Sequence, residues 1–462
     1  MGSPGLRHPG RPAREDRPGH VSTGRRSRSP GSARIRVARR VRDSPDQHVD
    51  APRRPLGGRW ELLPFAGTTV AEKAARRPSD RGAVPAGTVE PRRTLPARPR
   101  AAPAPSKGRP PMTADSAPTR RLVAELEERA REALPWFVAD YYGAVAGGRS
   151  ERDADLAAWD AIRFRPAALR GELDGDTTTT VLGTEVRGPV LIAPMAQQNA
   201  ADPRGEIAMA EAAARAGTLL GVSTNTALPF ERIAAAGAPW WFQVYLLADR
   251  DVTHALIERA AEHGARALML TVEMPVLRGE RPGIEPLTWP EIPGKARLGN
   301  LTEQERALVL GRPVPNPGLD DIGRLRSVSG LPVLVKGVLR GEDARRAVDA
   351  GASGVVVSTH GGRRMDGSIT AVGALAEVVD AVGADAEVYI DSGVRTGRHV
   401  LAALALGARA VFVGRPLMWA LAVGGADEVA GLLGLLDREF RVMLRQSGAA
   451  SIRDLGGLVA RS

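Results

Sequence analysis

From Val190 onward the chain alternates short, wholly apolar runs with longer amphipathic segments. A strand that is buried on both faces shows continuous rather than alternating hydrophobicity, so runs of this kind are typical of a parallel sheet covered by helices. There are eight of them: Val190–Pro194, Leu219–Ser223, Trp241–Tyr245, Ala267–Val272, Val333–Lys336, Gly354–Ser358, Glu387–Asp391 and Ala410–Gly414.

The amphipathic segments predict a helix after each run. The predicted helices are Glu206–Ala216, Pro229–Ala236, Val252–His263, Leu319–Ser327, Gly341–Ala350, Val372–Val382, Gly397–Leu406 and Asp427–Leu444. Eight strand–helix units indicate an α/β fold of the (β/α)8 TIM-barrel type. A doubly wound open sheet is the alternative, but it usually carries a glycine-rich fingerprint after its first strand, and the segment APMAQQ has none. Before the barrel, helical spacing from Leu122 to Val145, interrupted by Pro135, predicts a pair of N-terminal helices.

Charge divides the chain into two parts. The whole chain carries +11, yet residues 1–111 hold 25 Lys and Arg against 9 Asp and Glu, which leaves 39 against 44 for residues 112–462. The first part also holds 18 of the 36 prolines. We therefore predict a disordered leader over 1–111, preferably interpreted as sequence upstream of a true start at Met112, and a barrel domain over 112–462. A nucleic-acid-binding arm is the alternative interpretation of the leader.

Other compositional features narrow the class of protein. The chain has no cysteine, which excludes disulfides, thiolate metal sites and a Cys nucleophile. It has no uninterrupted apolar run of about 18 residues, the length that a membrane span needs. The Arg25-Arg26 pair lacks the apolar segment of a secretory signal, although an Arg-rich leader resembles an organellar transit peptide. A cytoplasmic protein that uses neither a membrane nor nucleic acid is the expectation.

The ends of the last two runs predict a phosphate site. Gly414-Arg415-Pro416 follows one run, and Asp391-Ser392-Gly393-Val394-Arg395 ends the other. Backbone N–H groups at a glycine turn and one arginine from each loop suit a dianionic phosphate, which barrels often bind after strands 7 and 8. Two helix-start turns with solvated arginines are the alternative.

The end of the sixth run carries a candidate base and a candidate anion clamp. Ser358-Thr359-His360-Gly361-Gly362-Arg363-Arg364 places a histidine and an arginine three residues apart. The glycines allow close approach of the backbone to a ligand, and a guanidinium binds a carboxylate with two donors. The loop suits a substrate whose carboxylate lies next to the reacting carbon.

These motifs resemble the FMN-dependent α-hydroxy-acid oxidase and dehydrogenase family, which includes glycolate oxidase, lactate oxidase and mandelate dehydrogenase. The resemblance runs from about Leu134 to Leu455. The segments that carry it are STHGGRRMD at Ser358–Asp366, DYY at Asp140–Tyr142, IAPMA at Ile192–Ala196, DPRGE at Asp202–Glu206, FQVY at Phe242–Tyr245, LVKG at Leu334–Gly337, DSGVRTG at Asp391–Gly397 and LALGARAVFVGRP at Leu404–Pro416.

The resemblance implies FMN as cofactor and assigns the site residues. It implies that the flavin is held by Pro194, Met195, Ala196, Ser223, Gln243, Thr271, Lys336, Asp391, Ser392, Gly393, Arg395, Gly414 and Arg415. For the substrate it implies Tyr141 and Arg363 on the carboxylate, Tyr245 on the hydroxyl oxygen and His360 as base. Whether His360 takes the hydroxyl proton or the α-proton stays open at this stage.

The chain departs from the family at several positions. Glu273 stands where the family has an aspartate that orients the histidine, and its carboxylate on a longer arm is expected to keep that role. Glu280 falls in the register of a substrate-gripping arginine, which Arg278 or Arg281 could replace. Milder changes are Thr359 for the usual Asn, Arg364 for Gln and Asn225 for a pocket tryptophan, and the expected lid, Arg281–Gly318, is Pro-rich.

The expected function is FMN-dependent oxidation of an L-2-hydroxy acid of the lactate, glycolate or mandelate class to the 2-oxo acid. The flavin is then reoxidised by oxygen or another acceptor. A larger biosynthetic 2-hydroxy acid, admitted by a remodelled fourth loop, is the alternative, and the family resemblance suggests a homotetramer.

Overall fold

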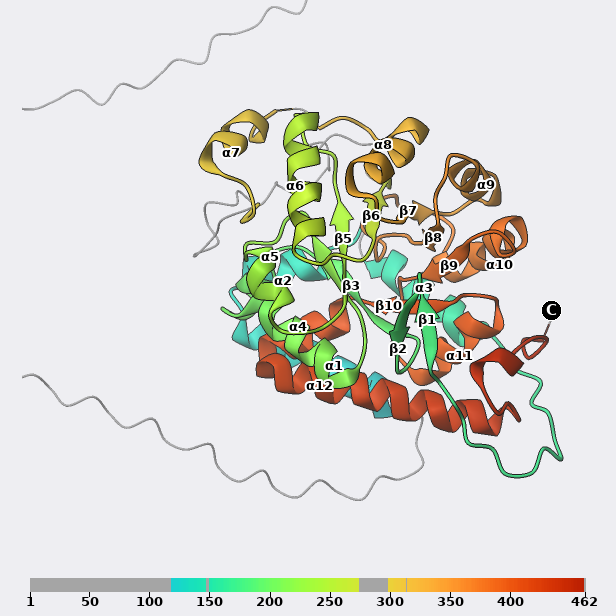
Figure 1. Ribbon diagram of the computed structural model, residues 1–462. Coiled ribbons are helices and arrows are strands. Elements are labelled where there is room, and N and C mark those ends of the chain that lie inside the picture. The colour runs from blue at the N-terminus through green and yellow to red at the C-terminus, as the bar shows by residue number, and fades with distance from the viewer. Residues whose placement is uncertain (1–117, 147–148, 274–297, 313, 461–462) are drawn as a thin grey trace, which may run out of the picture. The chain divides into compact units, whose positions relative to one another are not determined.

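Eight parallel strands close into a barrel in the computed structural model, which describes residues 118–146, 149–273, 298–312 and 314–460 (Figure 1). Each predicted apolar run forms one strand, so the predicted barrel is confirmed. Around the barrel the strands are β3 (Val190–Met195), β4 (Leu220–Ser223), β5 (Trp240–Val244), β6 (Leu268–Thr271), β7 (Val333–Val338), β8 (Gly354–Val357), β9 (Glu387–Ile390) and β10 (Ala410–Val413), and β10 pairs with β3.

Large side chains fill the interior of the barrel. Trp241, Tyr389 and Phe412 are buried and lie within 6.0 Å of one another between ring centroids. Because side chains alternate along a strand, the residues two positions later point to the same interior, one layer nearer the carboxyl ends. The middle of the barrel is therefore solid, and any ligand has to bind above it.

A short hairpin closes the other end of the barrel. Strands β1 (Thr179–Val181) and β2 (Thr184–Val186) pair antiparallel, and Val181 and Val186 pack into the interior cluster. The turn is fixed because the backbone N–H of Leu182 donates to the Glu387 carboxylate at 3.0 Å. The sequence analysis did not predict this hairpin, since strands of three residues are too short to show a pattern.

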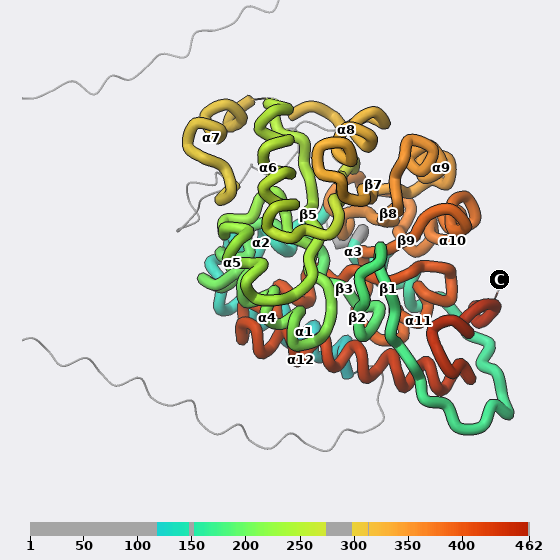
Figure 2. Tube along the Cα trace, viewed as in Figure 1, coloured from blue at the N-terminus to red at the C-terminus, as the bar shows by residue number. Residues whose placement is uncertain are grey.

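The outer helices lie around the barrel (Figure 2), and three of them begin at a residue whose side chain satisfies a first N–H group. Asp249 caps α6, Thr370 caps α10 and Thr396 caps α11, each through its side-chain oxygen. The helices that follow the strands are α4 (Gly205–Ala216), α5 (Phe230–Ala234), α6 (Arg250–Glu262), α8 (Leu319–Ser329), α9 (Gly341–Asp349), α10 (Ala371–Val382) and α11 (Gly397–Ala405).

The last helix consists of two segments. Helix α12 spans Arg415–Gln446 with a break at Gly424 and Gly425, so the helix predicted over Asp427–Leu444 is its second segment and the first segment was not predicted. The backbone leaves helical geometry at Gly424 and at Gly425, where φ is 59°, and this break hid the first half of the helix from the sequence pattern. Helix α12 is long and apolar enough by composition to cross a membrane, but it packs on α1, α4 and α11 like a core helix (Figure 1).

The N-terminal helices precede the barrel. Helices α1 (Pro118–Ala133) and α2 (Trp136–Gly143) confirm the predicted pair with its break at Pro135, whereas α3 (Arg149–Ala161) was not predicted. Part of the expected lid forms α7 (Glu303–Val309), which Thr302 and Glu305 start with a capping box. The predicted leader, the loop residues 278, 280 and 281, and the rest of the lid up to residue 297 lie outside the described residues.

Candidate active site

A row of polar side chains crosses the barrel at the carboxyl ends of three neighbouring strands. Ser223 and Gln243 lie 3.0 Å apart, Oγ to Oε1, and the Gln243 amide donates to the Thr271 hydroxyl at 2.9 Å. All three side chains are almost fully buried. They present amide and hydroxyl groups in fixed orientations, which suits the polar edge of a planar ring.

Lys336 is the centre of the polar layer. Its Nζ lies 2.8 Å from Glu273 Oε1, 2.8 Å from Ser358 Oγ and 3.2 Å from Asp391 Oδ2. Burial opposes the charge, but Asp391 and Glu273 outweigh it and raise the pKa of Lys336 above its ordinary value. The structure therefore fixes a positive charge at the mouth of the barrel, as predicted. Ser358 was missed as a site residue, although its place two residues after Val356 puts it on the interior face.

His360 and Glu273 form the second part of this network. The His360 Nδ1 lies 2.5 Å from Glu273 Oε1, so the longer side chain does reach the imidazole. Burial, aided by the charge of Lys336, lowers the pKa of His360 to about 4 against the opposing effect of Glu273. Although burial opposes it, Lys336 and His360 lower the pKa of Glu273 to about 2. At neutral pH the imidazole is thus neutral: we assign its proton to Nδ1, donating to Glu273, and the lone pair to Nε2.

The turn that carries His360 has a strained backbone. Three successive residues have positive φ: His360 at 55°, Gly361 at 67° and Gly362 at 72°. A non-glycine residue in this region costs of order 1 kcal/mol, so the surroundings must hold it. Ser358 Oγ accepts the N–H of His360 at 3.0 Å, and Ser392 Oγ accepts that of Gly361 at 3.0 Å. The base is therefore fixed through its backbone as well as its ring.

Two arginines meet the carboxyl end of helix α2. Arg363 Nη1 donates to the Tyr141 carbonyl at 2.7 Å, and Arg415 Nη2 donates to the Ala144 carbonyl at 2.7 Å. The negative end of a helix dipole favours cations at this position. The Arg363 guanidinium also lies 5.2 Å from the centre of the Tyr141 ring. The structure thus brings together the two residues predicted for the substrate carboxylate.

Tyr245 follows strand β5 on the same side of the barrel. Its backbone N–H donates to the Thr224 hydroxyl at 3.0 Å. Burial and the nearby Glu273 carboxylate raise the pKa of Tyr245, so the phenol stays protonated at neutral pH and can donate a hydrogen bond. It shares the mouth of the barrel with His360, as predicted.

Arg395 and Arg415 define an anion site that adjoins the arginine cluster at the end of α2, since Arg415 belongs to both. Arg395 follows Ser392 and Gly393, whose φ values are 72° and 77°, and Arg415 follows Gly414. Burial, together with neighbouring guanidinium groups, lowers the pKa of Arg395 to about 10 and that of Arg415 to about 9. Within the described ranges neither forms an ion pair with a carboxylate. Buried cations that no carboxylate neutralises are suited to bind a dianionic phosphate.

The end of strand β3 borders this anion site. A Cβ at Gly414 would find Met195 Sδ as its nearest neighbour, at 3.6 Å. All predicted cofactor residues lie at the carboxyl ends of the strands or in the loops that follow: Pro194 and Met195 at the end of β3 with Ala196 after it, Ser223, Gln243, Thr271 and Lys336 on β4 to β7, and Asp391–Arg395 with Gly414 and Arg415 after β9 and β10.

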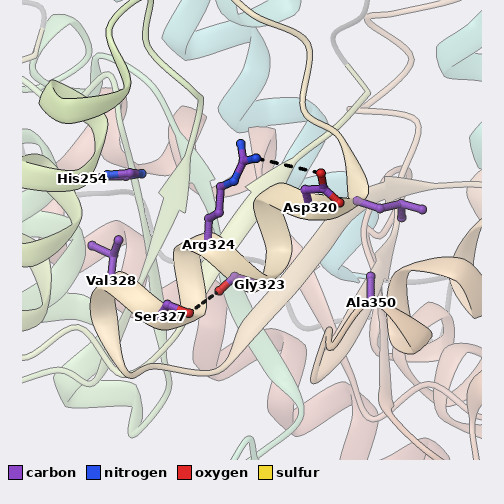
Figure 3. Close-up of a pocket in the computed structure, with 8 residues that line it drawn as sticks. His254, Asp320, Gly323, Arg324, Ser327, Val328 and Ala350 are labelled. Carbon is purple, nitrogen blue, oxygen red and sulfur yellow. Dashed lines mark hydrogen bonds and ion pairs between the residues drawn. The ribbon is translucent and has the colours of Figure 1, made fainter.

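A surface cavity elsewhere on the barrel contains none of these residues. It measures about 640 Å³ and lies between helices α6 and α8, beside His254 and Arg324 (Figure 3). Its polar groups interact with one another: Arg324 lies 3.9 Å from the Asp320 carboxylate, and the Ser327 hydroxyl donates to the Gly323 carbonyl at 2.9 Å. The cavity is therefore best described as a groove between two outer helices.

Comparison with known proteins identifies the family. Residues 130–461 match the family described as FMN-dependent dehydrogenase. The chain belongs to this family. It is an FMN-dependent oxidoreductase, and the resemblance seen in the sequence is confirmed.

Relatives of the FMN-dependent dehydrogenase family cover the whole barrel. L-lactate oxidase from Nostoc sp. is 40% identical over 370 residues, which span 74% of this chain and 98% of the relative. 4-Hydroxymandelate oxidase from Amycolatopsis orientalis is 38% identical, over 71% of this chain and 95% of the relative. A crystal structure of mandelate oxidase with (S)-2-phenylpropionate is 37% identical and has a TM-score of 0.65, over 73% of this chain and 98% of that one.

The residues present fit the family's cofactor. The pair Arg395 and Arg415 would hold the FMN phosphate, Gln243 and Ser223 the polar edge of the ring, and Lys336 the position where negative charge develops. FMN, when bound, supplies an acceptor for two electrons. The protein supplies the cationic and hydrogen-bonding surroundings.

Proposed function

We propose that this FMN-dependent oxidoreductase oxidises the α-carbon of a small L-2-hydroxy acid to the 2-oxo acid, with His360 as the base. The observation that carries the proposal is the pairing of a neutral imidazole with a buried carboxylate: His360 Nδ1 lies 2.5 Å from Glu273 Oε1. With Nδ1 as the donor to Glu273, Nε2 keeps a lone pair at neutral pH and can accept a proton from substrate.

Glu273 stabilises the charge that His360 acquires. When Nε2 takes the proton the ring becomes cationic, and the neighbouring carboxylate compensates it. Lys336, 2.8 Å from the same oxygen, keeps that carboxylate ionised. This division of charge works whether the proton comes from the hydroxyl or from the α-carbon of substrate, and both versions require His360.

The substrate carboxylate is assigned to Arg363 and Tyr141. Their mutual contact, 5.2 Å from guanidinium to ring centre, places a cation beside a phenol in a half-buried position. The protonated phenol of Tyr245 would then donate to the hydroxyl oxygen of substrate as it becomes a carbonyl. Positive groups on one side and the base on the other hold the α-carbon between them.

The choice of substrate rests on the relatives. Their names include an L-lactate oxidase and a 4-hydroxymandelate oxidase at similar identity, 40% and 38%. These names support oxygen as electron acceptor and leave aliphatic and aromatic 2-hydroxy acids as the two candidates. We further propose a homotetramer without a nucleic-acid partner, which light scattering of the purified protein would test.

Anaerobic reduction of the bound flavin tests the proposal. The flavin-loaded protein is mixed with L- and D-lactate, glycolate, (S)-mandelate and longer 2-hydroxy acids, and bleaching of the flavin absorbance is followed. We expect bleaching by at least one L-acid and a loss of at least 10³-fold in rate for His360→Gln. Bleaching by longer acids alone would favour the larger-substrate alternative. Flavin that no 2-hydroxy acid bleaches, or full activity in His360→Gln, would refute the proposal.

A further inference from the structure

Helix α3, which the sequence pattern did not predict, packs against the loop after β9. The indole N–H of Trp159 donates to the Ser392 carbonyl at 2.9 Å, and the indole is fully buried. A Cβ at Gly393 would lie 2.8 Å from Trp159 Cδ1, so the loop lies directly on the helix. Trp159 therefore fixes the loop that carries Arg395.

Four residues earlier on α3, the side chain of Asp155 contacts the loop after β8, which carries His360. Its carboxylate accepts a hydrogen bond from the Thr359 hydroxyl at 3.2 Å, and the same hydroxyl oxygen accepts the N–H of Gly362 at 3.1 Å. These two bonds span the strained turn that holds His360. Asp155 is 4% exposed and is thus a buried carboxyl group outside the proposed chemistry.

The two loops also contact each other at Ser392. The Thr359 N–H donates to Ser392 Oγ at 3.2 Å, and Ser392 is the residue whose carbonyl binds Trp159. A displacement of Thr359 would therefore move both His360 and the loop that carries Arg395.

The charges around Asp155 come from the loop after β9. Burial and the Asp391 carboxylate raise the pKa of Asp155 to about 6 against the opposing effects of Thr359, the first N–H of α10 and Arg395. The positive charge of Arg152, on the same helix, contributes to the lowered pKa of Arg395. No cation forms an ion pair with Asp155 in the part of the chain that the structure describes. A carboxyl group in this setting serves as a hydrogen-bond acceptor whether or not it is charged.

We propose that Asp155 is a positioning residue. Through Thr359 it holds the turn that carries His360 against the loop after β9, which would bind the flavin phosphate. The proposal rests on the proposed function for its effect on turnover, but not for its effect on FMN binding. It assigns α3 a role in the reaction that neither the helix's sequence nor its distance along the chain from His360 suggests.

Four variants test the proposal: Asp155→Ala, Thr359→Val, the double variant and Asp155→Asn. Turnover is measured per bound flavin, and the dissociation constant of FMN is measured by fluorescence. We expect each of the first two to lower kcat about tenfold and to weaken FMN binding three- to tenfold, the effect of losing the buried hydrogen bond between Thr359 and Asp155. The double variant should lose less than the product of the two single losses, because both substitutions remove this bond, although Thr359→Val also removes the acceptor of the Gly362 N–H. Asp155→Asn keeps an acceptor and should stay within twofold.

The matched control is Thr177→Val, which removes another buried hydroxyl at the far end of the barrel, 3.0 Å from the Arg187 carbonyl. It should lower thermal stability and leave kcat and FMN binding unchanged. Wild-type kcat and FMN affinity in Asp155→Ala, additive losses in the double variant, or an Asp155→Asn no better than Asp155→Ala would each overturn the proposal. If the protein binds FMN but oxidises no 2-hydroxy acid, the proposed function fails while the FMN affinities of the same variants still decide the role of Asp155.

Discussion

Glu273→Gln removes the charge that compensates a protonated His360 while keeping the size of the side chain. Glu273 Oε1 lies 2.5 Å from His360 Nδ1, which puts the centres of the two charges about 4 Å apart. At an effective dielectric constant of about 20, such a pair is worth about 4 kcal/mol, or about 10³ in rate as an upper limit. The amide oxygen of glutamine can still accept the Nδ1 hydrogen bond. We therefore expect the loss in rate to fall between about 10² and 10³.

The assay is the anaerobic rate of flavin bleaching by the best substrate, measured at saturating substrate in stopped flow. Glu273→Asp is the matched control, since it keeps the charge on a shorter arm and should lose much less activity. Flavin content and thermal stability of each variant separate a change in chemistry from a change in folding. A Glu273→Gln rate within fivefold of the wild type would show that the carboxylate does not stabilise the imidazolium, and the proposed division of charge would be wrong.

Three further predictions concern the anion site and a buried acid. Arg395→Met should weaken FMN binding by at least tenfold, measured by fluorescence titration, because it removes one of two buried cations; an unchanged affinity would place the phosphate elsewhere. Gly393→Ala should lower the free energy of unfolding by about 2 kcal/mol in a denaturant titration, since its φ is 77° and the new Cβ would meet Trp159 at 2.8 Å. Burial raises the pKa of Glu206 to about 7, so the folded state holds a proton that the unfolded state releases above about 4.5. Stability should therefore fall as pH rises from 4.5 through 7, and Glu206→Gln should remove up to about 3 kcal/mol of that fall.

Much of the barrel could be predicted from sequence because a strand covered on both faces leaves a strong signal. Runs such as Val333–Lys336 are apolar throughout and end in a polar residue, so strand positions and the functional end of the barrel follow together. Helix α3 gave no such signal, since only two of the residues whose burial is described, Asp155 and Trp159, are buried and one of them is charged. Pattern recognition fails where a helix is held by a few specific contacts.

The candidate site was also predicted only in part. His360, Arg363 and Lys336 were predicted because they stand at strand ends in recognisable motifs, and the structure brings them to one mouth. Ser358 and Asp155 were missed because their importance comes from hydrogen bonds between loops that are distant in sequence. Spacing along the chain shows which residues share a strand end, but not which loops touch.

The glutamate at position 273 is tolerated because its neighbour on β7 has no side chain. Gly337 has a φ of 108°, and a Cβ there would lie 1.8 Å from Glu273 Oε2 and 2.6 Å from its Cβ. Gly337→Ala should therefore push the carboxylate away from both His360 and Lys336 and reproduce the loss of rate expected for Glu273→Gln. Glu273→Asp keeps the Cβ of residue 273 that the added methyl group meets at 2.6 Å, so the double variant Gly337→Ala with Glu273→Asp should recover little of the rate that Gly337→Ala loses. A Gly337→Ala variant that bleaches its flavin within fivefold of the wild-type rate would mean that the carboxylate can hold the base from another position, and that its contact with Lys336 is not required.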